Sequence, residues 1–566
     1  MFDHDDDQDP AFEFDAISSC YIFSGSRGRD LCTTIAALIS DEYTSSDNQL
    51  SMVILRRNWN IIKKDACSQT PSHTLMKPFW ESIQVILNKD IREFETFKQQ
   101  GLVRFQDLKH YFYPGLGVAF EQAQLPVAAK VFQALFKTSP KWRRKCLDEN
   151  EEDDDNDLVS KSLKAASKTS VDKFDKNSQF NISYQFYFSD GTKYRVQTMV
   201  ETVDFYEGGK SLDSFHIKML NEEQMQEFQA LGVKSAQWTI GVHFVHYHGS
   251  MYDKCGNNNK TATGRIIIDH ELAMNQEDDE YSSLVSFARF TNIEESIPEQ
   301  DQWMIFPFVL GYSLAQKRWG VFFVGKCSDI VFRDESFNHL VLDSELKTTI
   351  QRVVTFGTQQ RQKWLDLVDG KSGGLIFLLH GPPGVGKSIT AETTAELLHC
   401  PLLSLTAGEL GVFPDDVEKH LQDSLKRAQR WKAIVLIDEA DVFMVQRSHE
   451  ELERNAIVSI FLRCLEYFDG VLFLTTNRIS SIDHAIRSRM SMIVEYESLS
   501  SDKRFKIWQD QLALNNISSL SHEQIHQLSL HDCNGRQIKH AVRMSIASSI
   551  DQTPTLQDIE RVLRYL

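Results

Sequence analysis

A glycine-rich segment at residues 381–389 carries the clearest chemical signal in the chain. It fits the pattern G-x-x-x-x-G-K-[ST] in full and continues with one apolar residue. In such a loop the backbone N–H groups surround phosphate oxygens, Lys387 reaches the outer phosphates and the Ser388 hydroxyl can bind Mg²⁺. An apolar run precedes the loop and a helical pattern follows it, so a helix N-terminus would face the same anion. The segment therefore predicts a nucleotide-phosphate site formed by Gly381, Pro382, Pro383, Gly384, Val385, Gly386, Lys387, Ser388 and Ile389.

Two consecutive carboxylates follow a second apolar run at residues 434–437. Asp438 lies 51 residues after Lys387, and Glu439 comes next. At the carboxyl end of a buried parallel strand, both side chains would reach the edge of the sheet where ligands bind. We expect Asp438 to orient a magnesium shell together with Ser388, and Glu439 to polarise an attacking water as a general base.

Three further polar residues could complete a hydrolytic site. Asn477 ends the apolar run VLFLTT and could hold the attacking water, although asparagine after a strand is also a common turn residue. Arg489, in AIRSR, could reach a neighbouring subunit's phosphate as an arginine finger, or it could pair with a surface carboxylate. Arg536, in NGRQIK, could touch the outer phosphate from a lid, or it could be a surface residue at a helix start.

Strand-like and helix-like segments alternate along residues 335–497, and these elements must position the residues named above. Five short apolar runs are typical of buried parallel strands, and helical segments separate them. The pattern predicts a P-loop α/β fold with a doubly wound parallel sheet. Residues 498–566 predict a helical lid, because strand patterns stop there and capping-box sequences occur at Ser521 with Gln524 and at Thr555 with Asp558.

The first 334 residues predict a mixed α+β, strand-rich region. We expect residues 1–15 to be an acidic disordered tail, residues 16–145 a mixed or helical region, and residues 146–178 a charged flexible linker. The segments TLMKPFWESIQVILNKDIREFETF and PVAAKVFQALF both show helix-like apolar spacing. Residues 179–334 alternate as strands do, and SDGT at residues 189–192 predicts a hairpin turn.

Composition bounds the class of protein. The chain has 566 residues, is 42% apolar and carries a formal net charge of −18. Residues 1–15 and 148–157 together contribute −15 and leave the remainder at −3, which argues against bulk capture of nucleic acid. Nine cysteines without a C-x-x-C pair, no basic leader and no apolar stretch long enough to span a bilayer predict a soluble intracellular protein of the cytoplasm or nucleus.

The motifs GPPGVGKS, IVLIDEAD, TTNR and AIRSRM, in this order and spacing, resemble the AAA family of ring-forming ATPases over residues 335–566. Further segments, among them DEADVF and NGRQIKHAV, resemble fungal AAA ATPases with a large N-terminal domain. The resemblance implies ATP and Mg²⁺ as cofactors and ATP hydrolysis in a homo-oligomeric ring, a hexamer in this family. It implies phosphate-loop, magnesium, hydrolytic, first-sensor, finger and second-sensor roles for Lys387, Ser388, Asp438, Glu439, Asn477, Arg489 and Arg536.

Several biological roles are compatible with these motifs. An N-terminal domain that holds a protein partner and moves with ATP turnover would make the protein a remodelling enzyme. The alternatives are an ATP-gated assembly scaffold with slow turnover and a nucleic-acid remodeller, which the near-neutral body disfavours. Threading through a ring pore would need an aromatic side chain in the loop after the second strand. Phe413 is the candidate, but Pro414 stiffens that loop and Phe413 could instead pack against the following helix.

Overall fold

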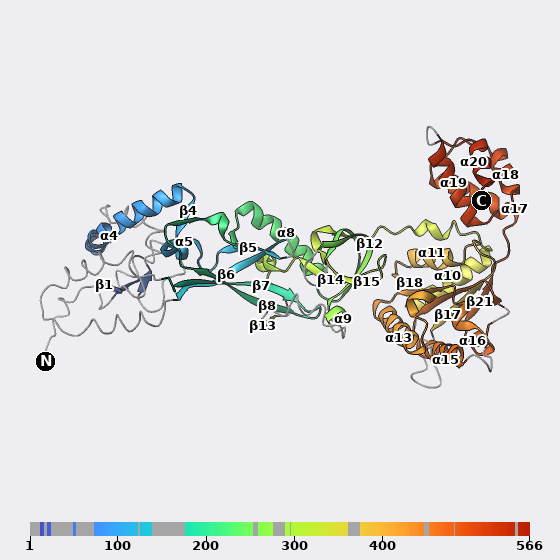
Figure 1. Ribbon diagram of the computed structural model, residues 1–566, viewed down its shortest axis with the longest axis horizontal. Helices are drawn as coiled ribbons and strands as arrows, with labels where there is room; N and C mark the ends of the chain where they lie inside the picture. The colour runs from blue at the N-terminus through green and yellow to red at the C-terminus, as the bar shows by residue number, and fades with distance from the viewer. Residues whose placement is uncertain are drawn as a thin grey trace.

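Two large antiparallel sheets and a parallel sheet follow one another along the long axis of the molecule, and a group of C-terminal helices lies above the parallel sheet in the view of Figure 1. The computed structural model describes residues 12–15, 20–23, 35, 49–51, 73–122, 125–137, 176–252, 258–274, 289–294, 296–359, 374–446, 452–479, 482–549 and 553–566. A small sheet at the N-terminal end contains β1 (Phe12–Asp15), β2 (Cys20–Phe23) and β3 (Gln49–Ser51). Strand β1 forms the end of the predicted acidic tail, whereas residues 1–11 of that tail and residues 146–175 of the predicted linker lie outside the described residues.

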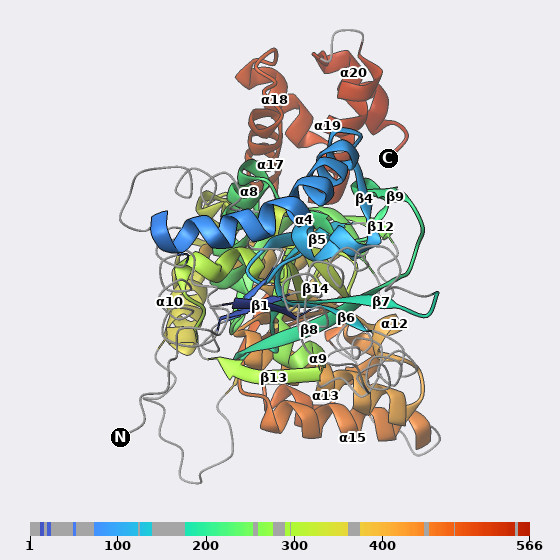
Figure 2. The ribbon, with the colours of Figure 1, turned by 90° about the vertical axis from the view of Figure 1, so that its left-hand side faces the viewer.

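The helix expected from TLMKPFWESIQVILNKDIREFETF is present as α4 (His73–Gln99), which lies in front in the end-on view of Figure 2. A six-stranded antiparallel sheet follows, in the order β10 (Lys218–Met219), β5 (Gly117–Gln122), β6 (Leu125–Lys137), β7 (Gln179–Ser189), β8 (Tyr194–Asp204) and β13 (Arg289–Glu294). The predicted SDGT hairpin is confirmed, because β7 and β8 pair antiparallel on either side of it. Shorter elements beside this sheet are β4 (Leu102–Arg104), η1 (Phe105–Asp107), α5 (Leu108–Tyr111), β9 (Gly209–Ser211) and η2 (Leu212–Ser214).

The helix predicted for PVAAKVFQALF is wrong, because this segment forms strand β6 in the middle of the sheet. Val127 and Ala129 face the main core of this region, and Ala128 between them packs against a second apolar cluster on the opposite face. A bulge between Val131 and Gln133 then breaks the alternation. A strand that is apolar on both faces and bulged loses its period of two, so its spacing imitates that of a helix.

The second antiparallel sheet closes on itself. Strand β11 (Val242–Tyr252) pairs with both β12 (Asn258–Asp269) and β15 (Arg318–Phe323), and β14 (Phe308–Ser313) joins the other two edges. We call this unit the closed sheet. Its core includes Trp238 from the capped helix α8 (Glu222–Trp238). The neighbouring short elements are α9 (His270–Met274), η4 (Glu299–Met304), η5 (Val324–Lys326), β16 (Cys327–Ser328) and η6 (Asp334–Phe337).

The predicted doubly wound α/β fold is confirmed in the next part of the chain. Five parallel strands lie in the order β18 (Leu402–Thr406), β19 (Ile434–Asp438), β20 (Val471–Thr476), β17 (Leu375–His380) and β21 (Met492–Glu495). One face is covered by α10 (Ser344–Gln359) and α11 (Lys387–Leu397), and the other by α13 (Pro414–Trp431) and α15 (Leu452–Tyr467), as Figure 1 shows. The short helices are α12 (Ala407–Leu410), α14 (Asp441–Met444) and α16 (His484–Arg487).

A separate helical group ends the chain, as predicted. It contains α17 (Ser501–Leu514), α18 (His522–Leu530), α19 (Gly535–Ser548) and α20 (Leu556–Leu563), packed around the fully buried Trp508. The capping boxes expected at Ser521 and Thr555 are both formed. Within the described ranges, no helix combines the length and apolar character needed to cross a membrane.

The closed sheet is joined to the parallel-sheet domain by side chains of both. Arg265 on β12 forms two hydrogen bonds of 2.5 and 2.8 Å with the Glu396 carboxylate near the end of α11. Arg430, near the end of α13, likewise forms two hydrogen bonds of 2.6 and 3.0 Å with the fully buried carboxylate of Asp269, which also accepts the Trp431 indole N–H at 2.9 Å. We call these contacts the domain junction.

Candidate functional site

The phosphate loop joins β17 to α11 along a path that requires glycine at two points. Gly381 has φ +145°, and a Cβ there would lie 2.1 Å from the Tyr496 carbonyl oxygen. Gly384 has φ +77°, and its Cβ would lie 2.6 Å from Asn534 Oδ1 in the lid. Any larger residue would displace backbone at the first position and the lid at the second. The strand–loop–helix order predicted for this segment is confirmed.

Lys387, the first residue of α11, lies inside the loop. Its ammonium donates to the carbonyl oxygens of Gly381 (2.8 Å) and Pro382 (2.7 Å) and to Asn477 Oδ1 (2.9 Å). Burial lowers the pKa of Lys387, whereas the negative charge of Asp438 opposes the shift. These weak neutral acceptors are groups that phosphate oxygens could replace, because a charged acceptor forms the stronger hydrogen bond with an ammonium.

The other predicted loop residues divide between the surface and the core. Pro382 and Pro383 are exposed, and Val385 packs into the core beside α10. Ile389, in the first turn of α11, is exposed despite its apolar side chain. Contact of these residues with nucleotide stays a prediction.

The two predicted carboxylates end β19 beside the phosphate loop. Asp438 Oδ1 accepts the Ser388 hydroxyl at 2.9 Å and the Thr475 hydroxyl at 2.5 Å. Glu439 follows with φ +53°, a left-handed conformation that is unfavourable for a residue with a side chain. The structure therefore brings Ser388 and Asp438 into contact and leaves the Glu439 side chain exposed at the sheet edge.

Asn477, after β20, lies beside Lys387 and not in an isolated turn. Its side-chain oxygen accepts the Lys387 ammonium, so its amide nitrogen is left for another acceptor. The preceding residue, Thr476, donates its hydroxyl to Asp441 and accepts the backbone N–H of Arg478. These contacts fix the strand end on which Asn477 lies.

The lid meets the phosphate loop directly. The Gly535 N–H, at the start of α19, donates to the Gly384 carbonyl at 2.9 Å. Arg536 is the next residue of α19, and its positive charge adds to burial in lowering the pKa of Lys387. The sequence predicted Arg536 as a site residue but did not reveal the hydrogen bond between the Gly535 N–H and the Gly384 carbonyl. Asn534 and Gly535, which directly precede Arg536, were the available signal for it.

Arg489 lies apart from this cluster. Within one protomer its guanidinium donates to the Ala485 carbonyl at 3.0 Å and forms an ion pair of 3.4 Å with Glu466. This contact matches the surface pairing considered from the sequence. A role as an arginine finger needs a second subunit and stays a prediction.

The loop before α13 exposes two apolar side chains. Val412 is 74% and Phe413 62% exposed, so Phe413 does not pack against the following helix as one reading of the sequence supposed. Pro414 is the first residue of α13, where proline supports a helix start.

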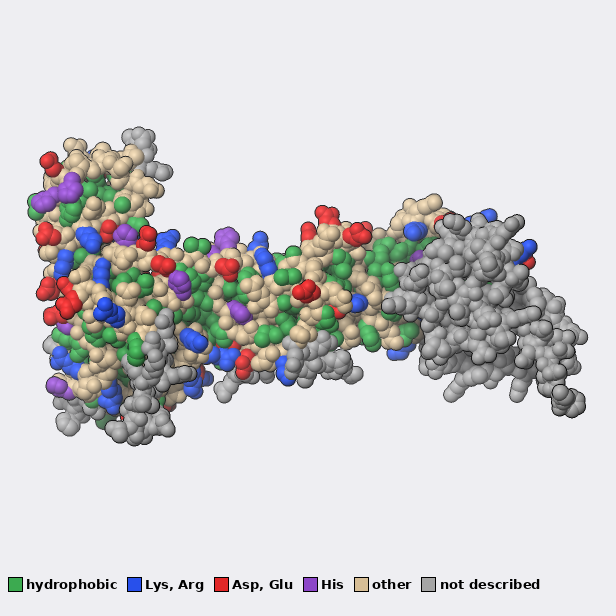
Figure 3. Space-filling model, turned by 180° about the vertical axis from the view of Figure 1, so that it is seen from behind, with side chains coloured by type: hydrophobic (Ala, Val, Ile, Leu, Met, Phe, Trp, Pro, Cys, Tyr) green, Lys and Arg blue, Asp and Glu red, His purple; other side chains and the backbone are tan. Residues whose placement is uncertain are grey.

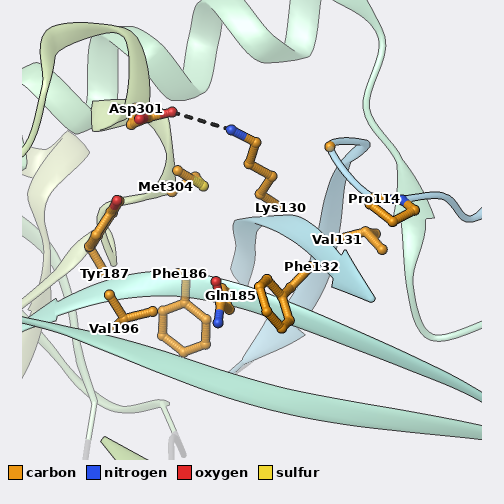
Figure 4. A pocket seen from close by; sticks show the side chains of 11 residues that line it. Pro114, Lys130, Val131, Phe132, Gln185, Phe186, Tyr187, Val196, Asp301 and Met304 are labelled. Atoms are coloured by element: carbon orange, nitrogen blue, oxygen red, sulfur yellow. Dashed lines mark ion pairs between the residues drawn. The ribbon is translucent and has the colours of Figure 1, made fainter. Parts of the chain in front are cut away.

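A cavity of about 350 Å³ lies far along the chain from the phosphate loop, on the six-stranded sheet (Figure 4). Lys130 and Asp301 form an ion pair of 3.6 Å at its rim, and Phe132 and Tyr187 contribute aromatic surface. None of its lining residues belongs to the phosphate loop or to the strands that carry the two carboxylates.

Comparison with known proteins agrees with this geometry. Residues 377–498 match the model of the family described as ATPase family associated with various cellular activities (AAA). Relatives include a 26S proteasome regulatory subunit homolog of Methanocaldococcus jannaschii, 30% identical over 23% of this chain and 37% of that protein. Others are the nuclear valosin-containing protein-like protein of Mus musculus (29% identical, 28% and 19% covered) and the cell division control protein 48 homolog B of Arabidopsis thaliana (28% identical, 29% and 29% covered). The chain thus spans 37% or less of the length of these relatives.

Among solved structures, the FIGL-1 AAA domain in complex with ADP aligns with a TM-score of 0.32 at 17% identity, covering 40% of this chain and 82% of that one. The sequence match lies on the phosphate loop, the two carboxylates, the asparagine and Arg489 together. The chain therefore contains an AAA ATPase domain, and it has AAA relatives in several eukaryotes.

Proposed function

We propose that this protein binds ATP with Mg²⁺ and hydrolyses it within a homo-oligomeric ring, a hexamer by family resemblance, and that turnover remodels a protein partner. The observation that carries the proposal is the convergence of Lys387, at the start of α11, with Asp438 and Asn477, from two separate strand ends, at one phosphate loop. The grouping with fungal AAA ATPases and a location in the cytoplasm or nucleus are parts of the same proposal.

The residues beside the loop fit a magnesium ion. Ser388 Oγ and Asp438 Oδ1 lie 2.9 Å apart and supply the hard oxygen ligands that Mg²⁺ prefers, directly or through water. When bound, the metal would supply positive charge to the phosphate oxygens. The protein's own residues would act around it. Lys387 would exchange its carbonyl acceptors for phosphate oxygens, and Glu439 would polarise a water that the Asn477 amide helps to orient.

The N-terminal sheets support a protein partner over a nucleic acid. Phe132 and Val200, on the six-stranded sheet, are 60% and 57% exposed, so apolar side chains are available there for contact with a protein partner. On the face shown in Figure 3, basic and acidic side chains are intermixed, whereas nucleic-acid binding needs basic groups gathered together.

The test is steady-state ATPase activity against protein concentration for the wild type, Glu439→Gln and Lys387→Ala. We expect specific activity to rise with concentration as the ring assembles. Glu439→Gln should lose about 100-fold or more in kcat and keep its nucleotide affinity, because it removes only the base. Lys387→Ala should lose nucleotide binding. Wild-type turnover in Glu439→Gln would defeat the hydrolytic proposal, and ATP binding without turnover in the wild type would favour the scaffold alternative.

A further inference from the structure

The hydroxyl of Thr475 lies between the two carboxylate residues of the site. Thr475, in β20, is 1% exposed and belongs to no phosphate-binding pattern. Its Oγ1 donates to Asp438 Oδ1 at 2.5 Å and accepts the backbone N–H of Glu439 at 3.0 Å. The single hydroxyl therefore donates its one proton to the last residue of the neighbouring strand and accepts a hydrogen bond from the residue that follows it.

The Glu439 backbone needs such a contact. Its φ of +53° is left-handed, a conformation that is unfavourable for a residue with a Cβ. The next N–H, of Ala440, donates to the Thr475 carbonyl at 2.9 Å. Together the hydroxyl and carbonyl of Thr475 hold two successive N–H groups of the turn, and a strained turn persists only where its surroundings fix it.

We propose that Thr475 is a positioning residue for ATP hydrolysis. Its hydroxyl holds Glu439 in the left-handed conformation that directs the carboxylate, and it holds the Asp438 carboxylate beside Ser388. The catalytic consequence rests on the proposed function, whereas the backbone consequence does not. Without this acceptor Glu439 relaxes to an ordinary backbone conformation, and its side chain leaves the sheet edge in another direction.

Substitution of Thr475 by valine and by serine distinguishes the effect of the hydroxyl from the effect of the branched side-chain shape. Thr475→Val keeps the branched shape but places a methyl group where Oγ1 now lies, 3.0 Å from the Glu439 nitrogen and 2.5 Å from Asp438 Oδ1. Carbon contacts need about 3.5 Å or more, so both neighbours must move. Thr475→Ser keeps the hydroxyl. Thr394→Val is the matched control, because that fully buried hydroxyl donates only to the Thr390 carbonyl within α11 at 2.6 Å.

The first readout is the division of the effect between kcat and nucleotide affinity in the full-length protein. We expect Thr475→Val to lose about 10- to 100-fold in kcat, the loss expected from misplacing a catalytic group by about 1 Å, with the Kd for ADP within about threefold of the wild type. Thr475→Ser should restore kcat to within about threefold of the wild type. A kcat for Thr475→Val equal to that of Thr394→Val would overturn the proposal.

The second readout does not need turnover. Amide hydrogen exchange, resolved to single residues across 434–444, should show faster exchange at Glu439 in Thr475→Val but not in Thr475→Ser. Ala440 should stay protected in all variants, because a backbone carbonyl holds it. If Thr475→Val fails to fold, Thr475→Ala gives the same comparison. If the wild type lacks ATPase activity, the proposed function fails and exchange alone decides the inference. Unchanged protection at Glu439 would then refute it.

Discussion

At the scale of single residues, Gly384 links nucleotide binding to the lid. Its φ of +77° and its contacts with Asn534 and Gly535 leave no room for a side chain. Alanine there would strain the loop and push the α19 cap away, so we expect Gly384→Ala to weaken ADP binding by about tenfold, or ~1.4 kcal/mol. Titration with a fluorescent ADP analogue measures this. Gly408→Ala is the control, because a Cβ at Gly408 meets no atom within 4 Å. Equal affinity in both variants would contradict the role of Gly384.

The meeting of Ser388 and Asp438, 50 positions apart, was predictable because each belongs to a recognisable motif, whereas the contacts of Thr475, which belongs to none, were not. The chemistry of phosphate binding requires Lys387 and Ser388 in one contiguous pattern, so the sequence alone identifies them. Thr475 acts through a contact of 3.0 Å with Glu439, a residue 36 positions away. That contact depends on which strands are neighbours and on a left-handed turn, and no spacing in the sequence encodes either.

At the scale of elements, His270 connects β7, α9 and β14 through a ring that the fold keeps neutral. Its side chain is buried, with Nδ1 3.2 Å from the Ser189 carbonyl and Nε2 accepting the Leu310 N–H at 3.3 Å. Burial lowers its pKa to about 4, although the charges of Asp269 and Asp190 oppose the shift. Protonation would turn the acceptor nitrogen into a donor facing the Leu310 N–H.

The sign of the resulting pH dependence follows from this shift. The unfolded chain takes up the His270 proton near pH 6.5, whereas the folded protein takes it up only near pH 4. The stabilising contribution is therefore complete above about pH 6.5 and is lost as pH falls toward 4, about 2 to 3 kcal/mol by pH 4.5. Urea unfolding at pH 7.5 and 4.5 measures it. His270→Gln keeps a donor and an acceptor but does not titrate. Between pH 7.5 and 4.5 this variant should therefore lose about 2 to 3 kcal/mol less stability than the wild type. An equal loss in the two proteins would show that His270 does not contribute.

Comparison of the parallel strands with the antiparallel strand β6 shows which elements the pattern of apolar residues can predict. The three central strands of the parallel sheet, β17, β19 and β20, are short and buried on both faces, and each is followed by a helix, so their apolar runs had one consistent reading. Strand β6 is also apolar on both faces, but it is long, carries a bulge and pairs antiparallel with both of its neighbours. Only its place between β5 and β7 identifies it as a strand.

At the scale of the whole molecule, the domain junction places the N-terminal sheets on the helix that begins at the phosphate loop. Helix α11 starts with Lys387 and carries Glu396 near its other end, held by Arg265. These two paired residues are 131 positions apart, which is why the sequence could not reveal the contact. A displacement of α11 on nucleotide binding would reach the closed sheet through one short helix, and under the proposed function this would be a physical route from hydrolysis to the protein partner.

An arginine finger, the role proposed for Arg489, would be the part of the site that only an assembly can complete. Because Arg489 pairs with Glu466 within its own protomer, away from the Lys387 cluster, we expect it to act on a neighbouring subunit's nucleotide. Arg489→Ala should bind ATP with nearly unchanged affinity and hydrolyse it about 1,000-fold more slowly.

Mixing variants distinguishes action between subunits from action within one. In a head-to-tail ring, each site combines the Glu439 of one subunit with the Arg489 of the next. An equal mixture of the inactive Arg489→Ala and Glu439→Gln proteins contains intact sites wherever the first supplies Glu439 and the second supplies Arg489. Random assembly makes about a quarter of the sites intact, so ATPase activity should return to about that fraction of the wild type. Replacing the Glu439→Gln protein by the double variant Glu439→Gln/Arg489→Ala should abolish this recovery, since no subunit then supplies the arginine. Mixed rings that form but regain no activity would show that Arg489 does not complete the site of its neighbour.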